Sequence, residues 1–311
     1  MALTLGIKQA AITRERSRGT QRRLNRHSRP SVPPLHEALG CIKSAVASFQ
    51  CHAKFQQMLP LYKTPLHIFN YDDIPPGCYY QAMNEGSPVR RFWHRQKFVA
   101  VASRLKDGDR VLDLGCGPGS FLSILGETQP RVEAIGLDIA SSQIEFAMKM
   151  VAPRFGGRIQ FQQHDASELH LPFPDHSFDA VTSIEMIEHI HPFIAYKMLE
   201  EAKRLLKPGG RILVTTPNYR SLWPLLEFGL QKFGPVKYHE QHINKFTPNS
   251  FVKFLESIGL EVQHFSTLFI VAPFLAGVAW KPAEQLCHWE QKSRSRIGSL
   301  LFAEAVPRHF D

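Results

Sequence analysis

Residues 109–120 have the sequence Asp-Arg-Val-Leu-Asp-Leu-Gly-Cys-Gly-Pro-Gly-Ser, and this stretch decides the fold class. The apolar side chains of Val111, Leu112 and Leu114 fit a strand that is buried on both faces, as in a parallel sheet. The three alternating glycines that follow let the backbone turn sharply and approach a ligand closely. Their G-x-G-x-G spacing differs from the G-x-G-x-x-G of dinucleotide-binding folds. The stretch therefore predicts a strand followed by a binding loop for a nucleoside-type ligand.

Acidic residues occur at the ends of three consecutive predicted strands. Asp113 lies in the first strand, Asp138 ends the second and Asp165 follows the third. Because parallel strands end at a common edge, we expect these carboxylates to face one crevice. Taken singly, Asp138 also fits a helix N-cap and Asp165 an Asx-turn. It is the ordered set that favours a ligand site.

In the order of its motifs, the chain resembles the class I S-adenosylmethionine-dependent methyltransferases over residues 95–265. The matching segments are 111–119, 136–138, 164–166, 172–181, 185–189 and 206–213. In its plainer motifs it is similar to type 11 methyltransferases and to ubiquinone-biosynthesis O-methyltransferases. The resemblance implies S-adenosylmethionine (SAM) as the cofactor.

The resemblance also implies a role for each part of the cofactor site. Asp138 would accept hydrogen bonds from the ribose hydroxyls and Asp165 from the adenine amino group. Ile139 and Ala166 would flank the adenine ring, while the glycine loop and the backbone near Ser183 would contact the methionine part. The implied cofactor-binding residues are Asp113, Gly115, Cys116, Gly117, Gly119, Asp138, Ile139, Asp165, Ala166 and Ser183.

Candidate catalytic residues follow the fourth and fifth predicted strands, where the methyl acceptor would bind. Methyl transfer from a sulfonium is an in-line displacement that depends on positioning, and a base is needed only for acceptors such as hydroxyls. The candidate bases are Glu185, Glu188, His189, His191, His239 and His242. Because histidine titrates near neutral pH, His189 and His242 are favoured, with Glu185 as a third catalytic candidate.

A metal site is an alternative use of the same residues. Glu185, Glu188 and His189 have the i, i+3, i+4 spacing of one helical face, and with His242 they offer ligands for a divalent metal. The pattern resembles that of metal-dependent small-RNA 2'-O-methyltransferases. However, the residues between His242 and Phe246 depart from it, and Glu-His after the fourth strand is widespread in the superfamily without a metal. We therefore expect no metal.

Strands alternate with helices beyond the glycine loop. Strands are expected at 109–114, 132–137, 159–163, 178–183, 211–216, 261–267 and 299–306, and helices from Ser120 and at 141–152, 192–206 and 247–259. This pattern predicts an α/β, doubly wound, mostly parallel seven-stranded sheet with helices on both faces and a last antiparallel strand. The methyltransferase domain would span 99–311, after an N-terminal helical cap at 36–98.

Residues 1–35 form a predicted disordered basic arm. Seven arginines between Arg14 and Arg29 are accompanied by a single acid, Glu15, and the whole chain has a formal net charge of +9. A solvated tail is the expectation, with a transit peptide, a nucleic-acid arm or a membrane anchor as alternatives. The five scattered cysteines contain no C-x-x-C pair, so neither a disulfide framework nor a zinc knuckle is predicted. We expect a cytoplasmic protein.

Residues 268–298 form a predicted apolar insertion. The run from Leu268 to Trp280 is shorter than the ~20 residues of a bilayer span, so no transmembrane span is expected. This run and residues 222–230 have four alternative roles: contact with a membrane interface, lining of a channel for an apolar substrate, cover of the core, or a dimer surface. We expect a small or lipid-like acceptor, methylated at oxygen, with a carbon acceptor as an alternative. An RNA or other nucleic-acid methyltransferase and a non-catalytic cofactor-binding scaffold are the alternatives.

Overall fold

The computed structural model describes residues 71, 74–165, 170–224, 242–293 and 295–308. The chain divides into two units, Met1–Leu61 and Tyr62–Asp311, and all the described residues belong to the second. The predicted basic arm, most of the predicted helical cap, Ala166 and His239 therefore lie outside the described residues.

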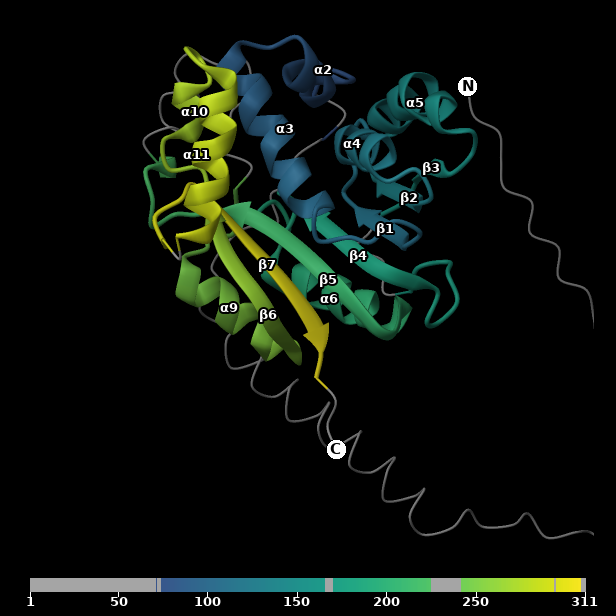
Figure 1. Cartoon of the computed structure of the whole chain (residues 1–311). Helices are drawn as coiled ribbons and strands as arrows, with labels where there is room; N and C mark the ends of the chain where they lie inside the picture. Colours follow the sequence, from purple (N-terminus) through teal and green to yellow (C-terminus); the bar gives the residue numbers. More distant parts are fainter. Residues whose placement is uncertain (1–70, 72–73, 166–169, 225–241, 294, 309–311) are drawn as a thin grey trace, which may run out of the picture. The chain divides into compact units, whose positions relative to one another are not determined.

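A seven-stranded sheet forms the centre of the described domain (Figure 1). Its strands are β1 (Arg110–Leu114), β2 (Glu133–Asp138), β3 (Ile159–Gln163), β4 (Phe178–Ile184), β5 (Leu206–Pro217), β6 (Leu260–Leu268) and β7 (Leu300–Pro307). The order is β3-β2-β1-β4-β5-β7-β6. Strands β1 to β5 pair in parallel, whereas β7 is antiparallel to both β5 and β6. The predicted fold class is confirmed, including the antiparallel last strand.

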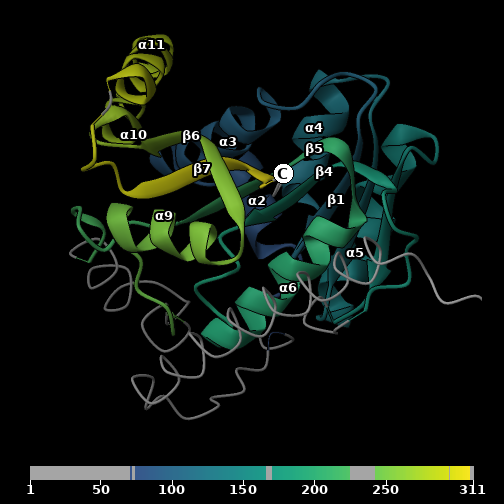
Figure 2. The ribbon, with the colours of Figure 1, turned by 90° about the horizontal axis from the view of Figure 1, so that it is seen from below.

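Helices cover both faces of this sheet, as the alternating sequence pattern predicts. They are α2 (Cys78–Asn84), α3 (Pro88–Ala102), α4 (Ser120–Thr128), α5 (Ser141–Met150), the short 3-10 helix η3 (Ala152–Phe155), α6 (Pro192–Leu205), α9 (Pro248–Ser257), α10 (Ala272–Leu275) and α11 (Trp280–Lys292). Figure 2 shows α6 and α9 on one side of the sheet and α3 and α4 on the other. None of the helices in the described part of the chain has the length and hydropathy needed to span a bilayer.

Local sequence signals fix where the helices begin. The Ser87 hydroxyl accepts a hydrogen bond from the Arg90 N–H, and Pro88 occupies the first turn of α3. Helix α9 starts with a capping box in which Thr247 and Ser250 each accept a hydrogen bond from the other's backbone N–H. Such caps satisfy N–H groups that have no partner within a helix. The residues of the predicted apolar insertion form α10 and α11, between β6 and β7.

Strand β5 starts five residues earlier than the predicted 211–216. Helix α6 ends at Leu205, as the Lys207-Pro-Gly-Gly sequence predicts, but no separate turn follows it. The strand begins directly at Leu206, and its register with β4 shifts between the pairs Phe178↔Leu206 and Ala180↔Arg211. The irregularity absorbs the residues that we expected to form a reversal, with Gly209 at φ 77°.

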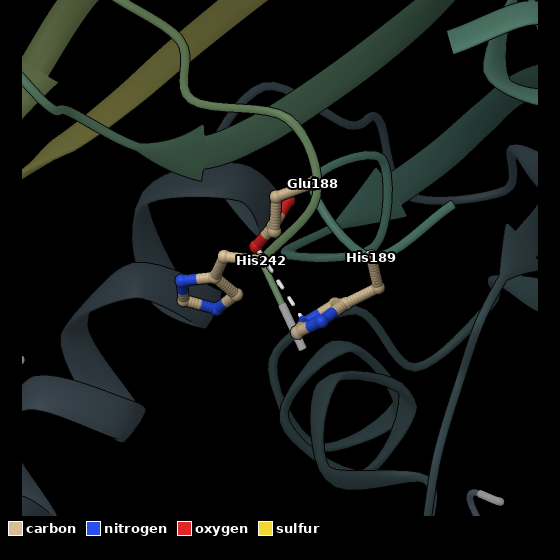
Figure 3. A group of neighbouring side chains, drawn as sticks. All are labelled: Glu188, His189 and His242. Carbon is tan, nitrogen blue, oxygen red and sulfur yellow. Dashed lines mark ion pairs between the residues drawn. The ribbon is translucent and has the colours of Figure 1, made fainter. Parts of the chain in front are cut away.

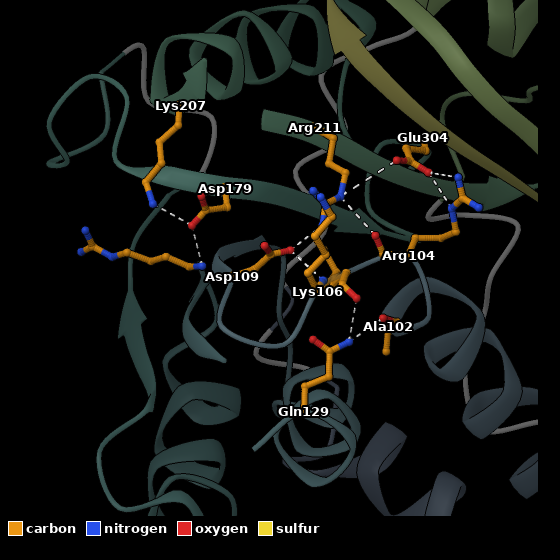
Figure 4. Close-up of polar contacts among 11 residues, drawn as sticks. Ala102, Arg104, Lys106, Asp109, Gln129, Asp179, Lys207, Arg211 and Glu304 are labelled. Carbon is orange, nitrogen blue, oxygen red and sulfur yellow. Dashed lines mark hydrogen bonds and ion pairs between the residues drawn. The ribbon is translucent and has the colours of Figure 1, made fainter. Parts of the chain in front are cut away.

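A network of charged side chains ties the amino-terminal ends of the central strands together (Figure 4). The Arg211 guanidinium donates to the Asp109 carboxylate and, at 3.1 Å, to the Arg104 carbonyl. Arg104 in turn forms an ion pair with Glu304 of β7. Arg211 and Asp109 are only 9% and 8% exposed, so their pairing compensates charges that water does not reach. The network links the end of α3 to β1, β5 and β7.

Replacing Asp109 with Asn should therefore destabilise the domain strongly. Arg211 would keep its buried charge but lose its hydrogen-bonded carboxylate, with the Glu304 carboxylate left at 4.0 Å, and breaking such a pair lowers the free energy of unfolding by about 3 to 5 kcal/mol. Chemical denaturation measures this change. The control is Lys207→Gln, which breaks the more exposed pair with Asp179 and should cost less than about 1 kcal/mol. Equal losses for both variants would contradict the assignment.

Candidate active site

The glycine loop after β1 has the backbone geometry of a ligand-binding turn. Gly115, Gly117 and Gly119 have φ angles of 75°, 52° and 77°, in the left-handed region that favours glycine. A Cβ atom on Gly115 would lie 2.7 Å from Met186 Cγ, and one on Gly119 would lie 2.6 Å from Phe161 Cζ. A Cβ on Gly117 would meet nothing within 4 Å. Two of the glycines thus permit close packing, while Gly117 borders open space.

Asp138 at the end of β2 fastens this loop. One carboxylate oxygen accepts a hydrogen bond from the Gly117 N–H at 2.7 Å, and the other accepts from the Ala140 N–H at 2.9 Å. The neighbouring Ile139 is 50% exposed although it is a large apolar residue. A carboxylate beside an exposed apolar side chain fits the ribose and adenine of a nucleoside. Helix α5 has Ala140 as its N-cap, without a side-chain cap hydrogen bond, so Asp138 is not the helix N-cap that the sequence offered as an alternative, and its contact with a ligand stays a prediction.

Asp113 lies in the interior beneath the glycine loop. It is 2% exposed, and the Thr182 hydroxyl donates a hydrogen bond to its carboxylate at 2.6 Å. Burial raises the pKa of Asp113 to about 7, the hydrogen bond from Thr182 opposes this shift, and the charge of Asp138 adds to it. In the protein without ligand, Asp113 is thus poised to exchange a proton near neutral pH.

The remaining predicted cofactor residues occupy different environments. Cys116 packs beneath β2, where a Cβ on Gly136 would lie 2.8 Å from its Sγ, and burial raises the pKa of its thiol well above the ordinary value. Ser183 is fully buried in β4. Asp165 is partly buried, two residues after β3. Cys116 and Ser183 can therefore contribute to a cofactor site through their backbone and their packing.

The segment 185–191 is a turn, whereas the alternative metal site needs a helix there. Strand β4 continues to Ile184, and the Glu185 N–H donates to the Thr215 carbonyl at 3.0 Å, which keeps the chain in the sheet until this point. Glu185 then adopts a φ of 50°. Its side chain forms an ion pair with Lys97 of α3. The expectation that Glu185, Glu188 and His189 share one helical face is wrong.

Glu188, His189 and His242 form a compact cluster (Figure 3), in which one ligand atom from each side chain lies within 4.8 Å of the others. In the figure, the Glu188 carboxylate lies between the two imidazole rings. Its Oε1 is 3.9 Å from His189 Nε2, and its Oε2 accepts a hydrogen bond from the Thr216 hydroxyl at 2.9 Å. The ring centroids of the two histidines are 4.8 Å apart. The structure thus brings together His189 and His242, but with Glu188 in place of Glu185.

Burial gives Glu188 an unusual protonation behaviour. The side chain is completely buried, and this burial, followed by the neighbouring charge of Glu185, raises its pKa well above the usual range. Its Oε1 accepts no hydrogen bond from any described residue. A buried acceptor of this kind is costly unless a cation or a proton donor faces it. The nearby His189 imidazole, or a bound metal ion, would meet that need.

Residues that sequence reasoning missed hold the cluster in place. Tyr219 contacts His242 through a 2.8 Å hydrogen bond between its hydroxyl and Nδ1. The Asn244 side chain donates to the carbonyls of Ile187 and Ile190 at 2.8 and 2.7 Å, and the Asn244 N–H donates to the Glu188 carbonyl at 2.9 Å. The segment after His242 is thus joined to the turn after β4. Tyr219 contacts a residue 23 positions away in the sequence, and the Asn244 side chain contacts residues 54 and 57 positions away, so no local pattern signals these contacts.

Tyr71 connects the cluster to the cofactor side. Its hydroxyl donates to the His189 carbonyl at 3.4 Å, and its ring lies edge-on to the His189 imidazole with 6.2 Å between centroids. Burial, then the charges of Glu188 and Asp138, raise the pKa of Tyr71 above its ordinary value. Because the charges of Glu188 and Asp138 both raise the pKa of the Tyr71 hydroxyl, the cluster and the Asp138 side of the glycine loop border the same region.

His191, one of the candidate bases, has a structural role instead. Its Nδ1 accepts a hydrogen bond from the Phe193 N–H at 3.3 Å and caps α6. This side chain occupies the position where Ser, Thr, Asp or Asn is most common. It is therefore a matched control for tests of the other histidines.

The three side chains of the cluster offer ligands that suit a divalent metal. Two imidazole nitrogens and a carboxylate oxygen are ordinary ligands of zinc, iron or manganese, and the Glu188 Oε1 without a hydrogen-bond donor fits a cation. Glu185, a member of the alternative ligand set in the sequence, is paired with Lys97 and is not part of this group. A metal thus stays an alternative that uses Glu188, His189 and His242.

Residues 89–264, more than half of the chain, match a family model described as a methyltransferase domain. The chain belongs to the class I SAM-dependent methyltransferase family. This membership confirms the resemblance that rests on the glycine loop and on the motifs after it.

Relatives of known name lie within this family. A fatty-acid O-methyltransferase of Mycolicibacterium smegmatis is 33% identical over 152 residues, which are 49% of this chain and 52% of that protein. The chain thus spans about half the length of that relative. A ubiquinone biosynthesis O-methyltransferase of Aeromonas salmonicida is 31% identical over 193 residues, 60% of this chain and 75% of that one.

A solved structure supports the same fold. The PH0226 protein of Pyrococcus horikoshii aligns with 77% of this chain and 100% of its own, with a TM-score of 0.53 and 19% identity. At this identity the likeness concerns the fold alone.

Substitution of Gly117 should separate ligand binding from folding. In Gly117→Ala the methyl group would occupy the open space beside the loop, so the affinity for S-adenosylhomocysteine should fall at least about tenfold, while the left-handed backbone costs about 1 to 2 kcal/mol of stability. Calorimetry and thermal unfolding measure the two effects. The control is Gly209→Ala, at φ 77° and also facing open space, which should lose similar stability and no affinity. Equal affinities in both variants would remove the glycine loop from the cofactor site.

Binding of S-adenosylhomocysteine should depend on pH through Asp113. Without ligand this carboxyl titrates near pH 7, and a positively charged amino group of the ligand would favour its ionised form. Affinity should therefore rise as pH increases through about 7 and level off above it, because binding then releases no proton. Titrations between pH 5.5 and about 8.5 in buffers of different ionisation enthalpy test this.

The Asp113→Asn variant serves as the control for this titration. It should bind with an affinity that is flat over the same pH range. Thr182→Val, which removes the hydrogen bond that lowers the pKa of Asp113, should move the midpoint to higher pH. A flat profile in the unmodified protein would show that Asp113 keeps one protonation state throughout.

Proposed function

We propose that the chain transfers the methyl group of SAM to an oxygen atom of a small, lipid-like acceptor. The observation that carries this proposal is the cluster of Glu188, His189 and His242 beside the glycine loop. An imidazole next to a carboxylate is suited to remove the proton of a hydroxyl group. The similarity to a fatty-acid O-methyltransferase and to a ubiquinone biosynthesis O-methyltransferase supports an acceptor of this class.

The residues at the cofactor site fit SAM. Gly117 borders open space, Asp138 offers a carboxylate at the end of β2, and Ile139 exposes an apolar side chain beside it. When bound, SAM supplies a methyl group on a positively charged sulfur. The role of the protein is to hold this methyl group in line with the acceptor oxygen, since positioning provides much of the acceleration in such a displacement.

His189 is the proposed catalytic base. Its side chain keeps 16% exposure, whereas His242 is 6% exposed and has its Nδ1 engaged with Tyr219. Glu188 and His242 are positioning residues in this proposal: they fix the His189 ring and offset the positive charge that it gains. As the acceptor oxygen bonds to the methyl carbon, the carbon–sulfur bond breaks, the acceptor proton passes to His189 and S-adenosylhomocysteine leaves.

A metal-assisted variant of the same reaction uses the same side chains. A divalent cation held by Glu188, His189 and His242 would lower the proton affinity of an acceptor hydroxyl. In that case His189 would act as a ligand and not as a base. The two mechanisms differ in their response to metal removal.

The sequence also supports two alternative functions. The Arg-rich residues 1–35 favour an RNA or other nucleic-acid methyltransferase, for which binding would fall steeply with salt. A non-catalytic scaffold would bind the cofactor without turnover. The strand-four sequence Ser-Ile-Glu-Met lacks the Asn/Asp-Pro-Pro-aromatic motif of adenine N-methyltransferases, which disfavours that activity.

The test is methylation of a lipid extract with isotopically labelled SAM, followed by mass spectrometry of the labelled product. We expect a methyl ether or methyl ester, and a turnover in His189→Ala that is lower by about 10²- to 10⁴-fold, with affinity for S-adenosylhomocysteine within a factor of about two. His191→Ala is the control, because loss of a cap costs about 1 kcal/mol but should leave turnover intact.

Other outcomes of this experiment reject the proposal in different ways. A product with the labelled methyl group on carbon, or labelled RNA alone, would show that the acceptor is of another class. Cofactor binding without any labelled product from lipid or RNA would favour the scaffold. If exhaustive chelation abolishes activity and added metal restores it, His189 is a ligand; full activity after chelation ends the metal variant.

A further inference from the structure

The insertion between β6 and β7 is firmly fixed on its inner side. Phe269, Ala272 and Cys287 are almost completely buried in the core. The buried Glu290 carboxylate accepts hydrogen bonds from the N–H groups of residues 270, 271 and 272, at 3.0, 2.8 and 3.0 Å. It thereby anchors the start of α10 to α11. The exposure of apolar residues on the outer side is thus not the result of loose packing.

The outer side of the insertion exposes an apolar face. Val271, Phe274 and Val278 are 51%, 49% and 90% exposed. Their i, i+3, i+7 spacing places them on one side of a helical path, which continues past α10 because the Val278 N–H donates to the Leu275 carbonyl at 2.9 Å. Of the nine exposed large hydrophobic residues in the described part of the chain, five belong to residues 268–298. We call Val271, Phe274 and Val278 the apolar tip.

Basic side chains border the apolar tip. Arg90 and Arg91 of α3 and Lys281 of α11 are exposed, and the Arg91 guanidinium lies 5.6 Å from the ring centroid of Trp280. The first turn of α3 adjoins the tip, since a Cβ on Gly277 would lie 3.6 Å from Val89 Cγ2. Figure 1 shows α10 and α11 beside α3.

The acidic residues of the insertion are engaged elsewhere. Glu290 is buried at the start of α10, and Glu284 accepts hydrogen bonds from Trp280 Nε1 at 2.8 Å and Gln96 Nε2 at 3.2 Å. Glu284 keeps its negative charge, but Arg90, Arg91 and Lys281 outnumber it, so the rim of the apolar tip has a net positive charge.

A series of aromatic contacts joins the insertion to the active site. Phe269 packs on Trp93 with ring centroids 4.6 Å apart, and Trp93 packs on Trp223 at 5.8 Å. Trp223 in turn lies 6.2 Å from the His242 ring. The apolar tip thus belongs to the same side of the domain as the residues that would meet the acceptor.

We propose that the apolar tip and its basic rim dock on an anionic lipid bilayer. The three apolar side chains would enter the interface, and Arg90, Arg91 and Lys281 would meet the lipid phosphates. A second copy of this chain fits less well, because a two-fold contact would place the same cations opposite one another. The proposal deepens the proposed function, since a lipid-like acceptor would reach His189 from the bilayer to which the domain is bound.

Flotation of the full chain with vesicles tests this docking without cofactor or acceptor. We expect binding to phosphatidylcholine vesicles that contain 30% phosphatidylglycerol, and weaker binding to phosphatidylcholine alone, by about two orders of magnitude if each of the three cations contributes about 1 kcal/mol. The Phe274→Ser, Val278→Ser double variant should bind at least about tenfold more weakly. The control is Met148→Ser with Met150→Ser, which alters two residues of similar exposure on α5 and should change nothing.

A second measurement locates the contact within the chain. The fluorescence of a Val278→Trp variant should be quenched by brominated lipids far more than that of a Met148→Trp variant. Equal quenching, equal vesicle binding by the double variant and the unmodified chain, or no vesicle binding at all would overturn the proposal. So would light scattering that shows a dimer lost only in the double variant, since the tip would then be a self-interface.

The results of the vesicle experiments do not depend on whether the proposed function is correct. Vesicle binding is measured without SAM, so a chain that methylates nothing can still bind through the tip. Conversely, the Phe274→Ser, Val278→Ser variant should bind S-adenosylhomocysteine as the unmodified chain does.

Discussion

The hydrogen bond from the Gly117 N–H to the Asp138 carboxylate is the contact on which the site depends. It joins the turn after β1 to the end of β2 at 2.7 Å, and it forms only because three glycines accept left-handed backbone. With a side chain at Gly115 or Gly119, Met186 or Phe161 would have to move, and the loop would leave the sheet. One polar contact and three missing side chains thus create the space for a nucleoside.

The cluster of Glu188, His189 and His242 depends on a different kind of constraint, which is long-range. Glu188 and His189 lie in the turn after β4, whereas His242 comes from a segment that follows β5. Asn244 fixes that segment to the turn by bonding two of its carbonyls. Because Glu188 is fully buried there and its pKa is raised, small displacements of the segment would change both the geometry and the protonation of the cluster.

Local patterns predicted most of the sheet, because each strand is a short apolar run bounded by turn residues. They also predicted Asp138 at a strand end and the sharp glycine turn after β1. The prediction of one helical face was wrong for Glu185, Glu188 and His189. The Glu185 N–H pairs with the Thr215 carbonyl, so the chain stays in the sheet beyond Ile184 and then forms a turn. The partners Lys97, Tyr219 and Asn244 are distant in sequence, and a single sequence contains no signal for such contacts.

Three buried polar atoms without a hydrogen-bond partner lie near the cluster and the loop. Among the buried polar side-chain atoms that find no partner within the described residues are Ser120 Oγ, Glu188 Oε1 and Trp223 Nε1. Ser120 follows the glycine loop directly, and Trp223 contacts the His242 ring. Each such atom costs stability unless something bonds to it. By contrast, Arg211 and Asp109 compensate each other at the amino-terminal ends of the strands. A bound SAM molecule and an acceptor would relieve this cost at Ser120, Glu188 and Trp223, whereas Gln129 Oε1 and Ser177 Oγ lack a partner in another part of the described domain.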